Sequence, residues 1–393
     1  MKSICIIVNK YPNPIEPNAL VFVQQLAWSM ADKGVECSVI CPLPININPR
    51  YWSFPEKKVE ITENNNKVTI YQPKFIGFGQ AHKIFGKSPA PLTTSLFTKA
   101  VAKIIAKMDE KPDVVYGHFV TPAGIAAARI GRKYNIPSFM AHGEATFKTI
   151  NEFGPQKVKK ELSTLSGIIA VSTQNKEMLL SVDAVKEDVI GIFPNGYRTE
   201  RFFPRNKIES RKKYGFPQDK FIVGFVGSFD HRKGILRLEK AVEQMEDVVF
   251  ACAGKGKLHP TSSKCIFSRQ VENDELPYFY SALDLFVLPT LNEGCCNAII
   301  EALACGLPVI SSDLSFNYDI LDKSCSILIN PNKVDELVDA IKILKLDSEY
   351  FKTLSIGSLE KAKKLTINNR TSNILDFINS KMGMFDGKDN LIY

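Results

Sequence analysis

Apolar residues in this chain fall into short runs that alternate with amphipathic stretches along almost its whole length. Short apolar runs bounded by turn residues are typical of buried strands in a parallel sheet, and amphipathic stretches are typical of helices that cover such a sheet. In the first half the pattern predicts helices over Ala19–Asp32 and Leu92–Met108. It predicts strands there at Ser3–Val8, Glu36–Cys41, Asp113–His118, Ile136–Ala141, Gly167–Val171 and Val189–Phe193.

The same alternation of apolar runs and amphipathic stretches starts again at Phe221–Gly227, and it continues to the end of the second half. Further strands are predicted at Val248–Ala253, Asp284–Leu288, Val309–Ser311 and Ser326–Ile329. Alternation of strands and helices predicts an α/β fold with doubly wound parallel sheets. Because the alternation of strands and helices starts a second time, we expect one such sheet in each half.

The boundary between the halves is expected in 194–204, where an Asn-Gly turn lies between two prolines. A chain of 393 residues is also too long for one ordinary core. We therefore expect a first domain at 1–197 and a second at 198–373. From Ser348 onward the pattern is helical and free of proline to about Met382.

The amino-acid composition limits which cellular compartments and which classes of protein fit this sequence. The chain is 45% hydrophobic and 23% charged, an ordinary globular composition, and no apolar run approaches the roughly 20 residues that span a bilayer. The opening apolar run is shorter than a signal-peptide core, so we expect it to form the first strand. Nine scattered cysteines without a Cys-x-x-Cys pair favour a reducing cytoplasm and argue against a zinc site.

Charge is unevenly distributed between the halves. Residues 1–197 carry 23 Lys/Arg and 16 Asp/Glu, a net of +7 out of +8 for the whole chain. A basic half can face an anionic membrane, nucleic acid or only solvent, and no nucleic-acid module motif is present. Residues 74–111 combine apolar side chains with Lys99, Lys103 and Lys107. This segment is expected to be a core-packed helix with a solvated lysine face, a docking site for anionic lipid, or both.

The segment 290–306 carries the most informative chemistry. Two carboxylates, Glu293 and Glu301, are separated by seven residues that begin with a Gly-Cys-Cys-Asn loop at 294–297 and continue into an apolar helix. Gly306 follows as the expected C-terminal cap. A helix that starts after a strand offers free N–H groups and a positive dipole end to a phosphate, and carboxylates accept hydrogen bonds from diols. The segment therefore suits a sugar joined to a nucleoside diphosphate.

Two further segments at strand ends carry charged or titratable residues. The loop 227–234, from Gly227 to Gly234, contains Arg232 and Lys233, which could neutralise a diphosphate or could be only a solvated basic turn. His142 ends a predicted strand in the first half, at the sheet edge where open α/β sheets bind ligands. A lone histidine at a strand end is most often structural.

Taken together, these segments resemble the retaining glycosyltransferases of family 4, which have the GT-B fold. The resemblance covers nearly the full length and is strongest from Gly227 to Asp313. It rests on Glu293-x7-Glu301 with Gly294, on Lys233, on Gly254-x-Gly256, on His142-Gly143, and on Pro194-Asn195-Gly196 followed by Phe-x-Pro. It implies two Rossmann-like, doubly wound domains facing a central cleft, with the acceptor at the first domain and the donor at the second. The last helix is expected to cross back, so that about 374–393 completes the first domain.

The resemblance also implies roles for individual residues. The catalytic set would be His142, Glu293, Arg232 and Lys233, with His142 near the reacting carbon and Glu293 on the sugar hydroxyls. The nucleotide-sugar contacts would come from Gly227, Arg232, Lys233, Gly294, Cys295, Cys296, Asn297 and Glu301, with Glu301 on the ribose. His118 would shape the acceptor side. No protein nucleophile is implied, because in this family the leaving phosphate is thought to take the proton of the acceptor.

The chain departs from the family pattern in two places. Ser228 stands where relatives have an arginine after the first glycine, so Arg232 is expected to supply that cation. The loop Asn9–Ala19 has three prolines and three asparagines where many relatives have a Gly-Gly pair. No Asp-x-Asp pair occurs anywhere, and single-Rossmann transferases use such a pair to hold a metal. We therefore expect neutralisation of the diphosphate without a metal and without a cofactor.

These features predict a retaining, hexosyltransferase-type glycosyltransferase that uses a nucleotide-diphosphate sugar, with a UDP-sugar favoured. The expected acceptor is a glycan or a lipid-linked molecule of cell-surface polysaccharide biosynthesis, and the expected place is the cytoplasm or the inner face of the membrane. A nucleotide-sugar epimerase of the same fold is one alternative. A non-catalytic subunit that binds a nucleotide sugar is another. A dinucleotide dehydrogenase is disfavoured, because no Gly-x-Gly-x-x-Gly follows the first strand.

Overall fold

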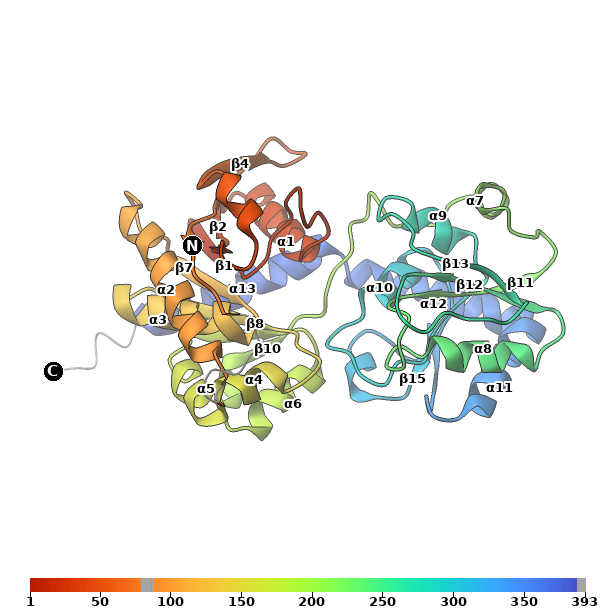
Figure 1. Cartoon of the computed structure of the whole chain (residues 1–393). Coiled ribbons are helices and arrows are strands. Elements are labelled where there is room, and N and C mark those ends of the chain that lie inside the picture. The colour runs from red at the N-terminus through yellow and green to blue at the C-terminus, as the bar shows by residue number, and fades with distance from the viewer. Residues whose placement is uncertain (79–85, 87, 387–393) are drawn as a thin grey trace. The chain divides into compact units, whose positions relative to one another are not determined.

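The computed structural model describes residues 1–78, 86 and 88–386, and within them the chain divides into two compact units. The first unit is Met1–Phe193 together with the segment from Thr371 onward, and the second is Pro194–Arg370. Each unit is built from helices around a mostly parallel sheet (Figure 1).

The first unit contains an eight-stranded sheet in the order β10-β9-β8-β7-β1-β2-β5-β4, in which only the β4–β5 pair is antiparallel. Its strands are β1 (Ser3–Ile7), β2 (Glu36–Ile40), β4 (Lys57–Ile61), β5 (Lys67–Tyr71), β7 (Val114–His118), β8 (Ser138–His142), β9 (Gly167–Ala170) and β10 (Ile190–Ile192), with a separate pair β3 (Leu43–Pro44) and β6 (Lys74–Phe75). Its helices are α1 (Val21–Asp32), α2 (Ala90–Lys107), α3 (Ile125–Tyr134), α4 (Lys148–Phe153), α5 (Pro155–Leu162) and α6 (Thr173–Ser181), with short turns at Pro49–Ser53, Val120–Gly124 and Glu187–Val189.

Alternate residues of β1 are buried on opposite faces of this sheet. Ile4 and Ile6 pack into one core with residues of α1 and of the C-terminal helix α13 (Ile367–Asp386). Cys5 and Ile7 pack into another core with residues of α2 and α3. A parallel strand that is covered on both faces must be apolar throughout, which explains the continuous apolar run at the start of the chain.

The second unit contains a six-stranded parallel sheet in the order β13-β12-β11-β14-β15-β16. Its strands are β11 (Phe221–Val226), β12 (Val248–Ala253), β13 (Cys265–Arg269), β14 (Leu285–Leu288), β15 (Val309–Ser312) and β16 (Ser326–Ile329). Its helices are α7 (Lys207–Tyr214), α8 (Ile235–Glu243), α9 (Leu276–Ser281), α10 (Asn297–Ala304), α11 (Val334–Leu346) and α12 (Ser348–Lys364), with a short turn at Ser315–Asn317.

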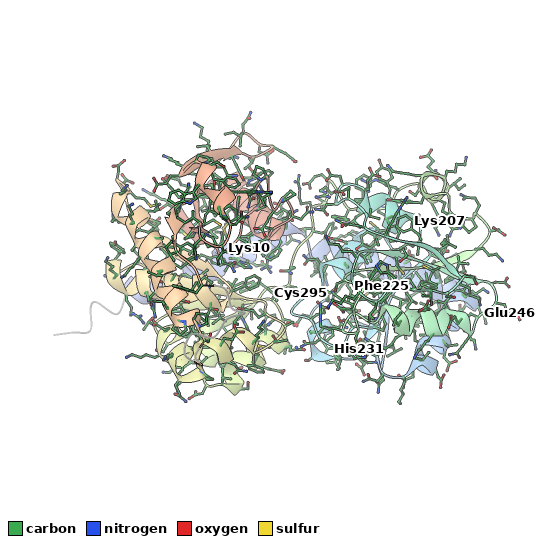
Figure 2. The ribbon with its side chains drawn as sticks, in the orientation of Figure 1. Lys10, Lys207, Phe225, His231, Glu246 and Cys295 are labelled. Atoms are coloured by element: carbon green, nitrogen blue, oxygen red, sulfur yellow. The ribbon has the colours of Figure 1, made fainter. Side chains whose placement is uncertain are left out.

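Helices cover both faces of the second sheet. Helices α8 and α11 pack together on one side, and α9, α10 and α12 pack on the other (Figure 1). Phe225, labelled in Figure 2, is fully buried in the core between these layers. Written in the order of appearance, the strands run 3-2-1-4-5-6, which is the strand order of dinucleotide-binding Rossmann domains.

The strands predicted from the apolar runs are confirmed, and so are the two predicted helices of the first half. The β4–β5 hairpin and β13 were not predicted. In β4 the apolar Val59 and Ile61 are exposed and the partly buried residues are Lys58 and Glu60, so the strand lacks the apolar run that marks a buried strand.

The two crossings between the units lie at Phe193–Pro194 and Arg370–Thr371. The first precedes the sequence-based boundary at Tyr197, because Tyr197 already pairs with the segment before α13, through its N–H to the Leu365 carbonyl at 3.0 Å. The expected return of the last helix is confirmed, since Ile374 and Ile378 of α13 are fully buried in the core around β1.

Candidate functional site

The second sheet reverses its strand order between β11 and β14, which are hydrogen-bonded neighbours. In open α/β sheets, ligands bind beyond the carboxyl ends of the strands at this kind of point. The loop 227–234 leaves β11 and the loop 289–296 leaves β14. Figure 2 labels His231 on the first loop and Cys295 on the second. The loops are joined directly, since Leu291 donates its N–H to the Arg232 carbonyl at 2.9 Å.

The Glu293 carboxylate is held where these two loops meet. Its Oε1 receives the Lys233 Nζ at 2.7 Å and the Arg232 Nη1 at 2.5 Å. The Thr290 hydroxyl donates to the same oxygen at 2.9 Å. Glu293 is 9% exposed and Thr290 is fully buried, so the carboxylate is held away from solvent. Three residues that the sequence had placed in one site are therefore brought into contact, and Thr290 is a fourth that sequence reasoning missed.

Two cations share the Glu293 carboxylate in this cluster, and the Asp230 carboxylate of the same loop interacts electrostatically with both of them. Burial by itself works against the charged form of Lys233, but Cys296 and Glu293 outweigh it, and the pKa of Lys233 is raised above its usual range. Lys233 is therefore charged at neutral pH. Arg232 is 40% exposed along its side chain and also donates to the Asn292 carbonyl at 2.7 Å. A buried and a half-exposed cation side by side suit an anionic ligand such as a diphosphate.

Helix α10 starts beside this cluster, with Cys296 as its N-cap residue. Cys296 lies near Lys233, with 3.9 Å between Sγ and Nζ. The first N–H groups of a helix need acceptors, and Cys296 offers only a thiol, which is a weak one. Burial raises the pKa of the Cys296 thiol, and the nearby Lys233 partly opposes this. The helix terminus therefore adds hydrogen-bond donors and a positive dipole end to the charge of Lys233.

The Asn297 side chain at this terminus is oriented by a residue from the domain junction. Asn195 donates from Nδ2 to the Asn297 Oδ1 at 2.8 Å, and its backbone N–H points to the Cys295 Sγ at 3.4 Å. The sequence had indicated only a turn at Asn195. Its contact with α10 bridges about a hundred residues of chain, so no local pattern could have shown it.

Glu301 lies in the second turn of α10, away from the Glu293 cluster. Its Oε2 accepts a hydrogen bond from the hydroxyl of Tyr280, a fully buried residue of α9, at 2.9 Å. Burial raises the pKa of Glu301 to about 7, and the bond from Tyr280 only partly opposes this. The carboxyl therefore changes its charge close to neutral pH. Tyr280 is a further residue that sequence reasoning missed.

A pocket of about 330 Å³ lies at the carboxyl ends of β11, β12 and β13. Its lining residues include Gly227, Ser228, Gly254, Lys255 and Gln270. Gly254 allows two of its walls to meet, because a Cβ there would lie 1.9 Å from the Gly227 carbonyl oxygen. Ser228, which replaces the arginine of relatives, donates to Asp230 at 2.6 Å. The glycines at these positions therefore shape the pocket rather than only turning the chain.

His142 ends β8 in the first unit and is fully buried. Its Nδ1 lies 2.6 Å from Oε2 of Glu144, whose Oε1 accepts the Val120 N–H at 2.7 Å. Burial works against the charged form of Glu144, yet His142 and these N–H donors outweigh it and lower its pKa. The Nε2 of His142 is buried, and no described residue is hydrogen-bonded to it. Sequence reasoning had named His142 but not Glu144.

In residues 1–78, 86 and 88–386, no group of three or more His, Cys, Asp or Glu side chains is arranged to hold a metal ion. None of the helices in those residues combines the length and the apolar character needed to cross a bilayer.

Comparison with known proteins identifies the family. The model for glycosyl transferases group 1 matches residues 206–361, and the model for glycosyltransferase family 4 matches residues 19–201. Between them the two models span most of the chain. The chain belongs to the family 4 (group 1) glycosyltransferases. The resemblance found in the sequence is thus confirmed, and the protein is a glycosyltransferase.

Relatives of this glycosyltransferase agree in length and fold. A Bacillus subtilis protein named as a teichuronic acid biosynthesis glycosyltransferase, TuaC, is 28% identical over 85% of this chain and 87% of its own. Sucrose-phosphate synthase from Thermosynechococcus elongatus superposes with a TM-score of 0.75, at 18% identity, over 98% of this chain and all of that one. HepE of Anabaena, solved in complex with UDP, superposes with a TM-score of 0.73, at 15% identity, over 97% of this chain and all of its own. The predicted GT-B fold, with two Rossmann-like domains, is confirmed.

Proposed function

We propose that this glycosyltransferase moves a sugar from a nucleoside-diphosphate sugar to an acceptor hydroxyl, with retention of the anomeric configuration and without a metal ion. The observation that carries the proposal is the cluster of Glu293, Lys233 and Arg232 at the strand-order reversal of the second sheet. Lys233 of this cluster lies beside the N-terminus of α10. Such a site can neutralise a diphosphate with protein groups alone.

In the proposed reaction the bond between the anomeric carbon and the diphosphate oxygen breaks, and both electrons of that bond go to the leaving diphosphate. The acceptor oxygen forms the new bond on the same face of the sugar and passes its proton to a leaving phosphate oxygen. Lys233, Arg232 and the N–H groups at the start of α10 stabilise the negative charge that grows on the diphosphate. Preorganised charges of this kind are worth several kcal/mol in a transition state.

We propose roles for the remaining predicted contact residues as well. Glu301 would accept hydrogen bonds from the two ribose hydroxyls in its ionised form, and Glu293 would hold hydroxyls of the transferred sugar. The pocket at the ends of β11–β13 is the proposed seat of the base, because its volume of about 330 Å³ suits a nucleoside-sized group. We favour UDP as the nucleotide, in line with the UDP bound to HepE. His142 would contact the transferred sugar through Nε2.

The proposed acceptor is a glycan or a lipid-linked saccharide of cell-surface polysaccharide synthesis, in line with the name of the Bacillus subtilis relative. A peripheral position at the cytoplasmic side of the membrane is part of the proposal. In the predicted docking segment 74–111, α2 buries Phe97, Val101, Ile104 and Ile105 and exposes Lys99, Lys103 and Lys107. Part of that segment, residues 79–85 and 87, lies outside the described residues.

The experiment that tests this function is a thermal-shift and turnover screen of the purified protein against UDP-, GDP- and ADP-sugars, with EDTA present. Binding to the native state raises the melting temperature by mass action. We expect one nucleotide class to stabilise the wild type and Lys240→Ala, a change of an exposed lysine on α8, but not Lys233→Ala or Glu293→Gln. Stabilisation or turnover that appears only when EDTA is replaced by a divalent metal would contradict the metal-free mechanism. Conversion of the sugar nucleotide to an epimer without acceptor would replace the transferase proposal with an epimerase.

A further inference from the structure

The first sheet has its own reversal of strand order, which the donor site does not use. Strand β1 pairs with β2 on one side and with β7 on the other, and the strands continue outward from there in both directions. The carboxyl ends of β1 and β7 are adjacent, since Ile7 pairs with Gly117. Ligands of open α/β sheets bind at this kind of point. The residues that follow these two strands are therefore candidates for a second binding site.

Three aromatic side chains meet at this point. Phe22, in the first turn of α1, lies 5.3 Å from His118 and 6.4 Å from Phe119 between ring centroids, and His118 lies 4.6 Å from Phe119. His118 is buried, whereas Phe22 and Phe119 are only partly buried. The buried ring thus supports two rings that keep exposed surface. Aromatic faces of this kind bind the C–H face of a ligand as well as other rings.

The backbone around this cluster is held in conformations that bulky residues avoid. Among the described residues, five other than glycine have a positive φ, and three of them are Asn or Asp, which tolerate it. The other two are Phe119, at φ 72°, and Leu20, at φ 48°, two residues before Phe22. Phe119 is pinned from both sides, by its N–H to the Ala141 carbonyl and by the Gly124 N–H to its own carbonyl, each at 2.9 Å. Such strain persists where the surroundings impose it, and it is found most often at functional sites.

A polar group without a partner lies at the end of the neighbouring strand. The side-chain oxygen of Asn9, two residues after β1, is buried, and no described residue is hydrogen-bonded to it. The loop that follows is ordered by its own contacts. Asn13 Oδ1 accepts the N–H groups of Ile15 and Glu16 at 2.9 and 3.0 Å, and Glu16 pairs with Lys10 at 2.5 Å. The corner therefore combines apolar ring faces with a free hydrogen-bond acceptor on a fixed backbone.

We propose that Phe22, Phe119 and Asn9 form a subsite for a pyranose ring of the acceptor. A pyranose presents an apolar C–H face, which the rings would cover, and hydroxyls at its rim, one of which would donate to Asn9. A bare alkyl chain would leave the side-chain oxygen of Asn9 without a hydrogen-bond donor. A phosphate is not the favoured ligand either, because Lys10, the one lysine of the loop, is paired with Glu16. The acceptor must then already carry a sugar, and the reaction that supplies it is an earlier glycosyl or sugar-phosphate transfer.

This inference rests on the proposed transferase function, and its test separates the two. The full-length protein is supplied with the nucleotide sugar that the screen selects, and with decyl glycosides of glucose, galactose, N-acetylglucosamine and glucuronic acid as acceptors. Decanol is the acceptor without a ring. The variants are Phe22→Leu, which keeps apolar volume but removes the ring, Phe22→Trp, which keeps a ring, and Asn9→Ala. The matched control is Phe203→Ala, which removes an exposed phenylalanine of the second unit.

We expect the wild type to use at least one glycoside and not decanol. Phe22→Leu and Asn9→Ala should each raise KM for the glycoside about tenfold, with the thermal shift by the nucleotide unchanged. Phe22→Trp and Phe203→Ala should stay within about twofold of the wild type. Equal use of decanol, or unchanged KM in Phe22→Leu, overturns the subsite, as does failure of the donor-competent enzyme to use any glycoside. Absence of any nucleotide-dependent shift in the wild type instead overturns the proposed function.

Discussion

Each of the two sheets reverses its strand order at one point, and the residues found at the two points differ in kind. At the second sheet, between β11 and β14, charged side chains meet, with Lys233 and Arg232 on Glu293. At the first, between β1 and β7, the rings of Phe22, His118 and Phe119 meet. The same backbone architecture thus carries an anion site in one unit and an apolar platform in the other.

Under the two proposals, the difference separates the two halves of one reaction between two copies of one fold. A diphosphate needs charge and N–H donors, and the loop before α10 supplies them without bulky side chains. A neutral ring needs surface and a few fixed hydrogen-bond groups, and strained but pinned backbone at Phe119 holds them in place. Function is therefore decided by the loops at the strand ends, and the sheets supply only their positions.

The largest expected effect on this comparison comes from removing Lys233, the buried cation of the second unit. Lys233→Ala leaves the Glu293 carboxylate with Arg232 alone, and we expect transfer to fall about 100- to 1,000-fold, because a preorganised charge on the leaving group is lost. Michaelis–Menten kinetics with a fixed acceptor measure the loss. Lys240→Ala, on the exposed face of α8, is the matched control and should behave as the wild type. A loss below about threefold in Lys233→Ala would mean that the cluster is structural.

The sequence was enough to predict the fold and the family, because both depend on repeated local signals. Buried parallel strands must be apolar throughout, so β1, β11 and β14 are visible as runs. The Glu293–Glu301 spacing, followed by Gly306 at φ 77° as the end of α10, marks a helix between two strands. The edge strand β4 lacked such a signal, since only one of its faces is covered.

The partners within the site could not be predicted, because they depend on contacts between distant segments. Tyr280 reaches Glu301 from another helix, and Asn195 reaches Asn297 from the domain junction. The pocket at the ends of β11–β13 is lined by residues that follow three different strands, which leaves no local pattern in the sequence. The roles assigned to His142, Glu293 and Glu301 stay predictions, and the remaining experiments address them.

A second experiment asks whether the first unit contributes a polar group to the chemistry as well as an apolar platform. Glu144→Gln should lower the transfer rate about 10- to 100-fold, because Glu144 fixes the orientation of the His142 ring through Nδ1. Glu144 would act as a positioning residue, so the effect should appear in kcat and in the pH profile of transfer. Glu161→Gln, which weakens the ion pairs of Glu161 with Arg129 and Arg132 of α3, is the control. An unchanged pH profile would assign Glu144 a structural role only.

A third experiment uses the raised pKa of Glu301, about 7, to test the ribose contact. The ionised carboxylate accepts both ribose hydroxyls, so affinity for the nucleoside diphosphate should fall about tenfold for each pH unit below 7. The stability of the ligand-free protein should change with pH in the opposite direction. The pKa is higher in the folded than in the unfolded state, so this group destabilises the fold as pH rises from about 4.5 to 7, by up to about 3 kcal/mol.

Calorimetric titration with UDP at pH 6, 7 and 8, and chemical denaturation at the same values, follow the two effects. Glu301→Gln cannot ionise, so both pH dependences attributed to this group should disappear. The variant should bind UDP weakly at every pH and be more stable than the wild type at pH 8. Opposite responses of UDP affinity and of stability to pH would identify Glu301 as the titrating group. A general loss of structure at low pH would instead weaken binding and stability together. Retention of the full pH dependence in Glu301→Gln would move the titrating group elsewhere.

The smallest expected effect comes from Arg232. It measures how the positive charge of the second unit's site is divided between Arg232 and Lys233. Its side chain is 40% exposed, against 12% for Lys233, so solvent and salt screen it more strongly. Arg232→Ala should lower transfer only about three- to tenfold, and raising the salt from about 50 to 500 mM should reduce the difference from the wild type. Lys233→Ala should show no such convergence, since buried charges are screened little. The double change Ser228→Arg with Arg232→Ala moves the cation to the position used by relatives. Recovery of activity in that variant would show that the chain keeps the same charge on the diphosphate from a different residue, and no recovery would mean that Arg232 acts only through Glu293.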